Sequence, residues 1–268
     1  TPTPSLPKAP TAPTYWKPCR VAEPRLPIPW LAPDDETTPL PDPDSAMTDP
    51  EGLLAIGATL SPQRLESAYR RGIFPWYSPG EPILWWSPDP RAIIVPARFH
   101  VSRSLQRQLR RRDHHVSLDT AFEAVVAACA APRLDQPGTW ITPEMADAYC
   151  RLHERGLAHS IEVWRDDRLI GGLYGVSTGR AFFGESMFSH ATNGSKIALA
   201  WLLCQLDIWQ FDFLDCQMPT DHLLSLGAET LPRRRFLLQL AASQRAATRL
   251  GPWTLSIERD DVARHWRG

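Results

Sequence analysis

The stretch F-D-F-L-D-C-Q-M-P-T-D-H, residues 211–222, is the part of the sequence around which the rest is organised. It begins as an apolar strand and presents Asp215 and Gln217 shortly before a proline ends the run. Because side chains alternate along a strand, these two residues are expected on one face, with Leu214 and Cys216 on the other. Burying a carboxylate or a carboxamide without partners is costly. The two groups therefore either satisfy each other or are held for a substrate.

The bulk composition describes a soluble globular protein. The chain has 268 residues, with 43% hydrophobic and 22% charged side chains and a formal net charge of −1. No apolar run reaches transmembrane length. The five cysteines are widely spaced, and neither they nor the eight histidines form a zinc motif, which is typical of a reducing cytoplasm. We expect a cytoplasmic protein, without a metal site and without a membrane partner.

Three segments follow from changes in composition along the chain. Residues 1–48 are rich in proline and are predicted to be disordered or draped over the surface. Residues 49–135 are predicted to form a small N-terminal domain that carries a basic helix. Residues 136–268 are predicted to form the catalytic domain, and the loop around residues 132–138 marks the junction between the two.

The N-terminal segment contains a helix and an unusual aromatic loop. A helix is predicted from the cap Ser61 to Gly72. Residues 74–91 then hold five prolines and three tryptophans around a short strand at residues 83–86, and a second strand follows at residues 92–95. A stiff aromatic loop of this kind is equally typical of a substrate contact and of a packed corner.

A one-sided row of arginines follows the cap residue Ser102. At 100° per residue, leucines 105 and 109 lie opposite a stripe that covers roughly a third of the helix circumference. The stripe consists of Arg103, Arg107, Arg110 and Arg111. Such a row is often only a solvated face, but the lack of interleaved acidic residues favours contact with phosphates.

The second half of the chain shows the order α-β-β-β-α-β-α. Helices are predicted at residues 142–156, 194–208, 221–227 and 233–247, and strands at 159–164, 169–177, 181–188 and in the opening stretch. This order resembles the acyltransferase fold of the GNAT superfamily. Glu185 lies among phenylalanines on the third of these strands, where it is either salt-bridged or a substrate-site acid.

Several segments together resemble the leucyl/phenylalanyl-tRNA–protein transferase family. They are G-L-L-A-I-G-A-T-L-S-P-Q-R-L, R-G-I-F-P-W-Y-S-P-G-E-P-I-L-W-W-S-P-D-P-R-A, G-T-W-I-T, H-S-I-E-V-W, G-E-S-M-F-S, D-C-Q and S-L-G-A. The resemblance implies an α+β protein, with a GNAT-like acyltransferase C-terminal domain and a smaller mixed α/β N-terminal domain. It also implies transfer of Leu, Phe or Met from aminoacyl-tRNA to proteins or peptides with N-terminal Lys or Arg, which marks proteins for N-degron degradation. No cofactor and no coenzyme A are implied, and a monomer is expected.

The resemblance also implies roles for individual residues. Asp215 and Gln217 match the positions that carry the transfer step, and Glu185 matches a further active-site position that helps hold the cationic peptide terminus. Trp76 and Trp140 match residues that contact the terminal adenosine and the aminoacyl group. The apolar pocket for the aminoacyl side chain corresponds to Leu173, Phe182, Leu202, Leu206 and Leu214. The arginine stripe matches the family's basic cluster for the acceptor end of tRNA.

Three other interpretations compete with this one. A coenzyme A-dependent GNAT acetyltransferase would need a Gly-rich pyrophosphate turn before the central helix, where this chain has S-H-A-T-N-G-S-K. A tRNA-binding module without catalysis would make the pair Asp215 and Gln217 structural. A Cys216 nucleophile lacks an evident histidine partner. Which atom accepts the amine proton stays open from the sequence.

Overall fold

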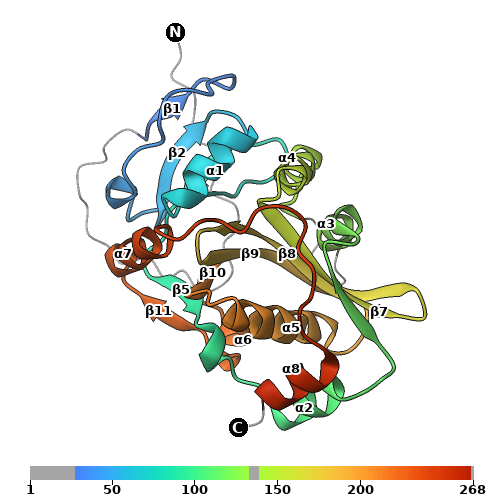
Figure 1. The fold of residues 1–268 in the computed structure, drawn as a ribbon. Helices are drawn as coiled ribbons and strands as arrows, with labels where there is room; N and C mark the ends of the chain where they lie inside the picture. Colours follow the sequence, from blue (N-terminus) through green and yellow to red (C-terminus); the bar gives the residue numbers. More distant parts are fainter. Residues whose placement is uncertain (1–27, 133–138, 267–268) are drawn as a thin grey trace.

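The computed structural model describes residues 28–132 and 139–266 of the chain (Figure 1). Within these residues it forms two mixed β-sheets covered by helices, which makes it a mixed α/β protein. The smaller sheet has the order β1 (Trp30–Leu31), β2 (Leu53–Gly57), β4 (Leu84–Trp86) and β3 (Phe74–Pro75). The seven-stranded sheet has the order β11 (Glu229–Leu231), β5 (Arg91–Ile94), β10 (Phe213–Gln217), β9 (Ala181–Ser189), β8 (Arg168–Thr178), β7 (Ala158–Arg165) and β6 (His115–Leu118).

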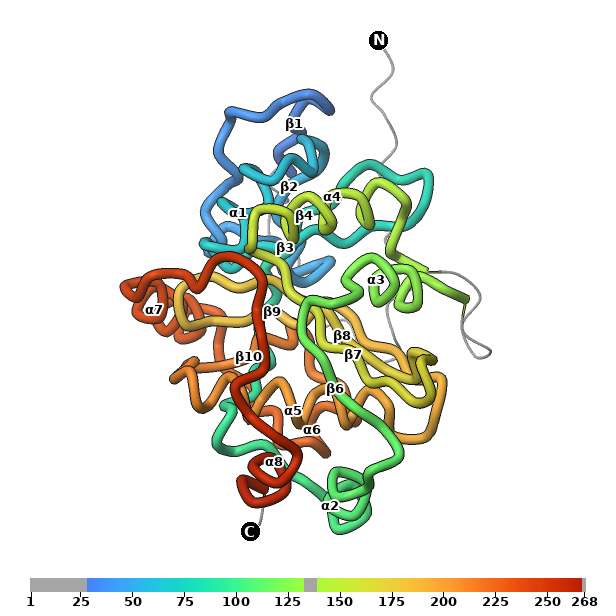
Figure 2. Tube along the Cα trace, turned by 45° about the vertical axis from the view of Figure 1, so that its right-hand side comes forward, coloured from blue at the N-terminus to red at the C-terminus, as the bar shows by residue number. Residues whose placement is uncertain are grey.

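Helices cover both faces of the larger sheet, and each face has its own apolar core (Figures 1 and 2). One face carries α1 (Pro62–Arg70), α3 (Phe122–Ala130) and α4 (Pro143–Glu154). The other carries α2 (Arg103–Leu109), α5 (Gly194–Ile208) and α8 (Arg259–His265). The short helix α6 (Asp221–Ser225) follows β10, and α7 (Arg233–Ser243) follows β11. The sheet is therefore buried on both sides, so a polar residue on a central strand must find its partner inside the protein.

The predicted helix ends agree with the structure. The Ser61 hydroxyl accepts a hydrogen bond from the Arg64 backbone N–H at 3.3 Å, which caps α1. Gly72 follows this helix with φ +71°, in the left-handed region that favours glycine. Helices α4 and α5 also lie where the sequence predicts them, and Thr142 caps α4 through the backbone N–H of Met145.

Other features of the fold were not predicted. Strands β1, β2, β3, β6 and β11 and helix α8 have short or weakly periodic sequences. Helix α2 ends at Leu109, so Arg110 caps it and Arg111 lies beyond it, which makes the predicted helical stripe wrong for its last two members. The buried side of the helix is confirmed, since Leu105 and Leu109 are both buried.

Part of the predicted proline-rich extension lies against the rest of the protein. Residues 28–48 include a short 3-10 helix, Pro43–Ser45, and contact α1, where the guanidinium group of Arg64 donates a hydrogen bond to the carbonyl of Asp35 at 2.9 Å. The remainder of the proline-rich extension, residues 1–27, and most of the predicted junction, residues 133–138, lie outside the described residues. The larger sheet takes β5 and β6 from before the junction, and the division at residue 135 stays a prediction.

The central parallel pair of the larger sheet positions the candidate site. Helix α5 connects β9 to β10, which run parallel with Asp215 beside Phe183. Each of these strands also contains a bulge. The pairing with β8 shifts between Gly184 and Ser186, and the pairing with β5 shifts between Asp215 and Gln217. Bulges re-aim side chains and are common beside active sites.

Candidate active site

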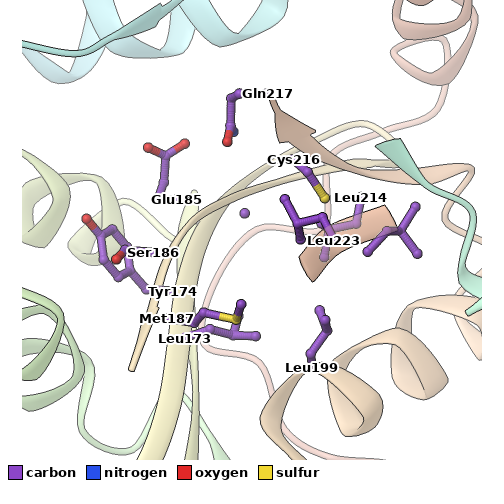
Figure 3. Close-up of a pocket in the computed structure, with 12 residues that line it drawn as sticks. Leu173, Tyr174, Glu185, Ser186, Met187, Leu199, Leu214, Cys216, Gln217 and Leu223 are labelled. Carbon is purple, nitrogen blue, oxygen red and sulfur yellow. The ribbon is translucent and has the colours of Figure 1, made fainter. Parts of the chain in front are cut away.

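A cavity of about 150 Å³ opens where β9 and β10 part (Figure 3). An apolar cavity of this size in another protein holds a benzene molecule. The lining is mostly apolar, with a few polar groups at one end. It consists of Ile94, Leu173, Tyr174, Gly184, Glu185, Ser186, Met187, Leu199, Leu214, Cys216, Gln217 and Leu223. Figure 3 shows Glu185 and Gln217 at one end, with Leu173, Met187 and Leu199 at the other.

The bulge in β10 overturns the predicted alternation around Asp215. Gln217 has φ +60°, in the left-handed region, and its side chain lines the cavity together with Leu214 and Cys216. Asp215 lies on the opposite side of the strand and does not line the cavity. The expectation that Asp215 and Gln217 share a face is therefore wrong, because strict alternation fails at a bulge.

Asp215 is held by Arg91, a residue that the sequence did not single out. The Arg91 Nε–H donates to Asp215 Oδ1 at 2.8 Å, and Nη2 donates to Oδ2 at 2.6 Å. Both side chains have 0% exposure. The guanidinium group also lies over the rings of Phe74 and Phe236, 5.0 Å and 4.5 Å from their centroids. Arg91 and Asp215 are 124 positions apart in the sequence. Their contact is therefore visible only in the three-dimensional structure.

The same ion pair anchors neighbouring backbone. Arg91 Nη1 donates to the carbonyl of Gly72 at 3.1 Å, which ties the end of the α1 segment to the large sheet. Asp215 Oδ1 accepts a second hydrogen bond, from the backbone N–H of Gln217 at 3.0 Å. The carboxylate thus fixes the turn that directs Gln217 into the cavity.

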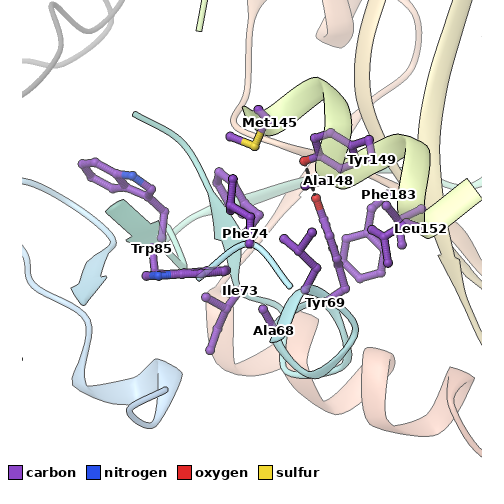
Figure 4. Packing of buried hydrophobic residues seen from close by; sticks show 14 of the residues in the cluster. Ala68, Tyr69, Ile73, Phe74, Trp85, Met145, Ala148, Tyr149, Leu152 and Phe183 are labelled. Atoms are coloured by element: carbon purple, nitrogen blue, oxygen red, sulfur yellow. Dashed lines mark hydrogen bonds between the residues drawn. The ribbon is translucent and has the colours of Figure 1, made fainter. Parts of the chain in front are cut away.

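Glu185 occupies the bulge of β9 and faces the cavity. The Tyr149 hydroxyl donates to its Oε2 at 2.6 Å, and the Tyr69 hydroxyl lies 2.7 Å from that of Tyr149 (Figure 4). Burial raises the pKa of Glu185 to about 7, although the hydrogen bond from Tyr149 and the nearby Tyr69 hydroxyl act to lower it. Within the described residues, Glu185 Oε1 and Gln217 Nε2 are buried without a hydrogen-bond partner.

The parallel register explains why these two side chains meet. Asp215 pairs with Phe183, so two further residues along each strand bring Gln217 level with Glu185. Both lie past the last paired residue, where the strands separate and the cavity begins. An acid and an amide with unused hydrogen-bonding capacity therefore converge at one end of an apolar cavity.

The predicted apolar pocket residues divide into two groups. Leu173 and Leu214 line the cavity. Phe182, Leu202 and Leu206 do not line it, but lie buried in the apolar cluster behind it. Met187 and Leu199 also line the cavity and were not predicted. Leu199 could have been found, because it lies three residues before the predicted Leu202 on α5 and residues with this spacing share a helix face.

The two predicted tryptophans lie outside the cavity lining, on segments that contact each other. Trp76 packs edge-to-face against Trp86, with ring centroids 5.8 Å apart. Trp76 and Trp140 are both partly buried against the apolar core on the α1, α3 and α4 side of the larger sheet. Tyr77 follows Trp76 directly, and Thr142 lies two residues after Trp140. Their hydroxyl groups are 3.2 Å apart, and this hydrogen bond joins the two segments.

The predicted basic residues lie on the surface around α2. Arg103, Arg107, Arg110 and Arg111 are all exposed. Arg111 forms an ion pair with Asp113 at 2.8 Å. Arg111 also borders a second cavity, which is polar and includes Arg165 and His190.

Two of the alternative interpretations lose support. Burial raises the pKa of Cys216 far above its usual range, so its thiol is not a reactive thiolate. At the start of α5, the backbone N–H of Ser195 already donates to the Ser189 hydroxyl at 2.8 Å. A pyrophosphate would need such N–H groups to be available.

Comparisons with known proteins agree with these features. A sequence profile described as leucyl/phenylalanyl-tRNA protein transferase matches residues 93–241, and the profile of its N-terminal domain matches residues 58–89. A leucyl/phenylalanyl-tRNA–protein transferase of Alkalilimnicola ehrlichii is 54% identical over 237 residues, which are 88% of this chain and 92% of the relative. That of Desulfatibacillum aliphaticivorans is 58% identical over 219 residues, which are 81% and 93%.

Among solved structures, one described as L-PGS from Bacillus licheniformis is 11% identical, covers 75% of this chain and 69% of that chain, and has a TM-score of 0.36. In the described part of the chain, no helix has the length and hydropathy needed to cross a membrane. The sequence comparisons do not favour the coenzyme A-dependent alternative. The chain belongs to the leucyl/phenylalanyl-tRNA–protein transferase family and is an aminoacyltransferase.

Proposed function

We propose that the cavity between β9 and β10 binds the side chain of Leu, Phe or Met while it is still esterified to tRNA. The acceptor is a protein or peptide with N-terminal Lys or Arg, whose α-amino group attacks the ester, and the product is marked for N-degron degradation. The observation that carries the proposal is the junction of an apolar cavity with the polar pair Glu185 and Gln217. The protein acts as a monomer in the cytoplasm.

The ester is already activated, so the enzyme mainly has to position the two substrates. Gln217 suits this task, because its carboxamide oxygen can accept a hydrogen bond from an amine without removing its proton. Its unpartnered Nε2 can donate to a substrate oxygen, and the neighbouring Glu185 Oε1 is an unpartnered acceptor. The crossover from β9 through α5 to the parallel strand β10 also supports a GNAT-like arrangement of the catalytic part, in which acyl transfer takes place where two central strands separate.

The direct test is transfer of labelled Leu from Leu-tRNA to a peptide that begins with Arg. We expect transfer by the purified protein, and we expect Gln217→Ala to slow it while Leu-tRNA still binds. An Ala-initiated peptide of the same length is the control acceptor. Absence of transfer to the Arg-initiated peptide would contradict the proposed function and would favour a tRNA-binding module instead.

Leu173 should control the choice of amino acid. It is buried at the apolar end of the cavity, so Leu173→Ala enlarges the space available to a side chain. One methylene group in such a pocket changes selectivity roughly 10–200-fold. We expect the ratio of Phe to Leu transfer to rise about tenfold or more, measured as relative kcat/KM with Phe-tRNA and Leu-tRNA.

A matched truncation separates cavity size from loss of stability. Leu203 is equally buried in the apolar cluster behind the cavity but does not line it. Leu203→Ala should therefore destabilise the protein by about 2–5 kcal/mol, as Leu173→Ala does, and leave the Phe to Leu ratio unchanged. Equal changes of the Phe to Leu ratio in both variants would contradict a role of Leu173 in binding the aminoacyl side chain.

The exposed arginines around α2 are proposed to bind the acceptor end of tRNA, together with Trp76 and Trp140 at the terminal adenosine and aminoacyl group. Arg103, Arg107 and Arg110 have no ion pair among the described residues, so their charge is available to phosphates. Arg111 is partly neutralised by Asp113. Phosphate binding by such residues releases counterions, which makes affinity dependent on salt.

Replacing Arg103 and Arg107 together by alanine should weaken tRNA binding and flatten its salt dependence. Each lost phosphate contact should reduce the slope of log K against log salt by about 0.7–0.9. Filter binding of Leu-tRNA at several salt concentrations measures this slope. Arg151→Ala is the control, since Arg151 is exposed but paired with Asp147 at 2.8 Å. An unchanged slope in the double variant would exclude this surface.

A further inference from the structure

The proton acceptor should be a carboxylate oxygen that has no hydrogen-bond partner in the protein. Both oxygens of Asp215 have partners, because Arg91 binds each of them and the Gln217 N–H also donates to Oδ1. The Arg91 guanidinium is always charged, and its side chain is completely buried. Asp215 is therefore the counter-ion of a buried cation, and its oxygens are committed to that pair.

Glu185 is arranged in the opposite way. Its Oε2 is held by Tyr149, and Tyr149 in turn accepts a hydrogen bond from Tyr69, since its own proton is donated to Glu185. Its Oε1 is buried, has no partner among the described residues and belongs to a side chain that lines the cavity. One oxygen is thus used to orient the carboxylate while the other is free to accept.

We propose that Glu185 Oε1 accepts the proton from the attacking α-amino group, and that Arg91 and Asp215 are positioning residues which direct Gln217. This inference deepens the proposed aminoacyl transfer and rests on it. It gives the three polar groups different tasks. Glu185 moves the proton, Gln217 orients the amine, and Asp215 fixes the backbone of Gln217.

The step balances without any further reactant. The amine nitrogen forms a bond to the ester carbonyl carbon as its proton passes to Glu185 Oε1. The bond between that carbon and the ribose oxygen then breaks, and the leaving oxygen receives the proton from Glu185. The products are the peptide bond and the free ribose hydroxyl, and the carboxylate is restored for the next cycle.

The surroundings of Glu185 suit a base that works near neutral pH. The titratable and charged groups that act on it are Tyr149 from α4, Tyr69 from α1, Tyr174 from β8, Asp215 from β10 and Arg91 from β5. Burial raises the pKa of each tyrosine well above its usual range, so all three stay neutral. A general base is most effective when its pKa is near the working pH, and the pKa of Glu185 is about 7.

The pH dependence of transfer tests the assignment. A free α-amino group has a pKa of about 7.7–8.0, so kcat/KM for the peptide requires loss of a proton from the amine and from Glu185. Below both values, log kcat/KM should rise with a slope of two against pH. In Glu185→Gln only the amine titrates, so the slope should fall to one, and the rate at pH 8 should drop by roughly 10²–10⁴-fold.

Tyr149→Phe provides a readout that a purely structural role would not move. Removing this donor takes away a hydrogen bond that favours the carboxylate, so the lower break in the profile should shift to higher pH. Tyr77→Phe is the matched control, because it removes a tyrosine hydroxyl that is bonded to Thr142 rather than to Glu185. That variant should keep both the slope of two and the position of the break.

Unfolding by denaturant provides a second readout that needs no substrate. The folded state raises the pKa of Glu185 above its ordinary value of 4.5. Between 4.5 and about 7 the folded protein therefore binds more protons than the unfolded chain, and this group's contribution to stability falls as pH rises. Glu185→Gln should lose that decline, so its denaturation midpoint relative to the unmodified protein should increase from pH 5 to pH 8.

Two outcomes would overturn the assignment. One is a Glu185→Gln variant that keeps a slope of two, and the other is a Tyr149→Phe variant whose rate falls by the same factor at every pH. Either result would contradict the role of Glu185 but would still be compatible with the proposed transferase function of the protein. If the unmodified protein transfers no Leu at any pH, the proposed function fails, and the two failures are thus distinguishable.

Discussion

Asp215→Ala should lower the free energy of unfolding by about 3–5 kcal/mol, the cost of leaving a buried charge without its partner. Arg91 would keep its positive charge at 0% exposure, between the rings of Phe74 and Phe236. The turn at Gln217 would also lose the acceptor of its backbone N–H. Chemical denaturation followed by circular dichroism measures the change.

The control for this substitution is an aspartate in an exposed ion pair. Asp147 pairs with Arg151 at 2.8 Å and is 63% exposed, so Asp147→Ala should cost less than about 1 kcal/mol. A cost for Asp215→Ala as small as this would contradict the buried pair.

A double-mutant cycle shows whether the two groups act as one unit. Arg91→Met alone should also be strongly destabilising, since it leaves the carboxylate of Asp215 buried and unpaired. Removing both charges together should cost clearly less than the sum of the two single changes, because contacting residues are coupled. Additive costs would mean that the bidentate contact contributes little.

The Asp215 prediction changes how a loss of activity should be interpreted. From the sequence, Asp215→Ala is expected to stop turnover because a catalytic carboxylate is removed. In the structure Asp215 does not reach the cavity, so lost turnover follows from lost stability and a misdirected Gln217. The surviving folded fraction should therefore keep a slope of two in its pH profile, with the break of Glu185 moved to lower pH because the Asp215 charge that raises its pKa is gone.

Gly171→Ala should also destabilise the protein, because strand β8 and the start of α5 are in backbone contact at Gly171 and Gly194. A Cβ atom on Gly171 would lie 2.4 Å from the carbonyl carbon of Gly194 and 2.5 Å from its Cα. Both are backbone atoms, so α5 would have to move away from the sheet. Overpacking of this kind costs about 1–3 kcal/mol and occasionally more.

The displacement should also be visible at the cavity, because Leu199 lines it from α5. We expect Gly171→Ala to weaken discrimination among Leu, Phe and Met as well as to lower the melting temperature. Gly80→Ala is the control: it has φ +84° but no atom within 4 Å of the new Cβ. That change should cost about 1–2 kcal/mol of backbone strain and leave selectivity unchanged. Equal changes of selectivity in both variants would exclude the close contact as the cause.

The helices were largely predictable because their signals are local. A cap such as Ser61 or Thr142 satisfies the backbone of its own first turn, and a glycine such as Gly72 ends the helix a few residues later. The short strands β1, β3 and β11 carry no such signal. They exist because partners far along the chain complete their hydrogen bonds.

The family, the chemical groups available for transfer and most of the longer helices and strands can be inferred from local sequence patterns. The directions and partners of those groups depend on the three-dimensional arrangement of the strands. Two bulges turn Glu185 and Gln217 into one cavity, and Arg91, distant in the sequence, removes Asp215 from it. The physical reason is that side-chain direction at a bulge and the charge balance of a buried site depend on neighbouring strands, which no local pattern records.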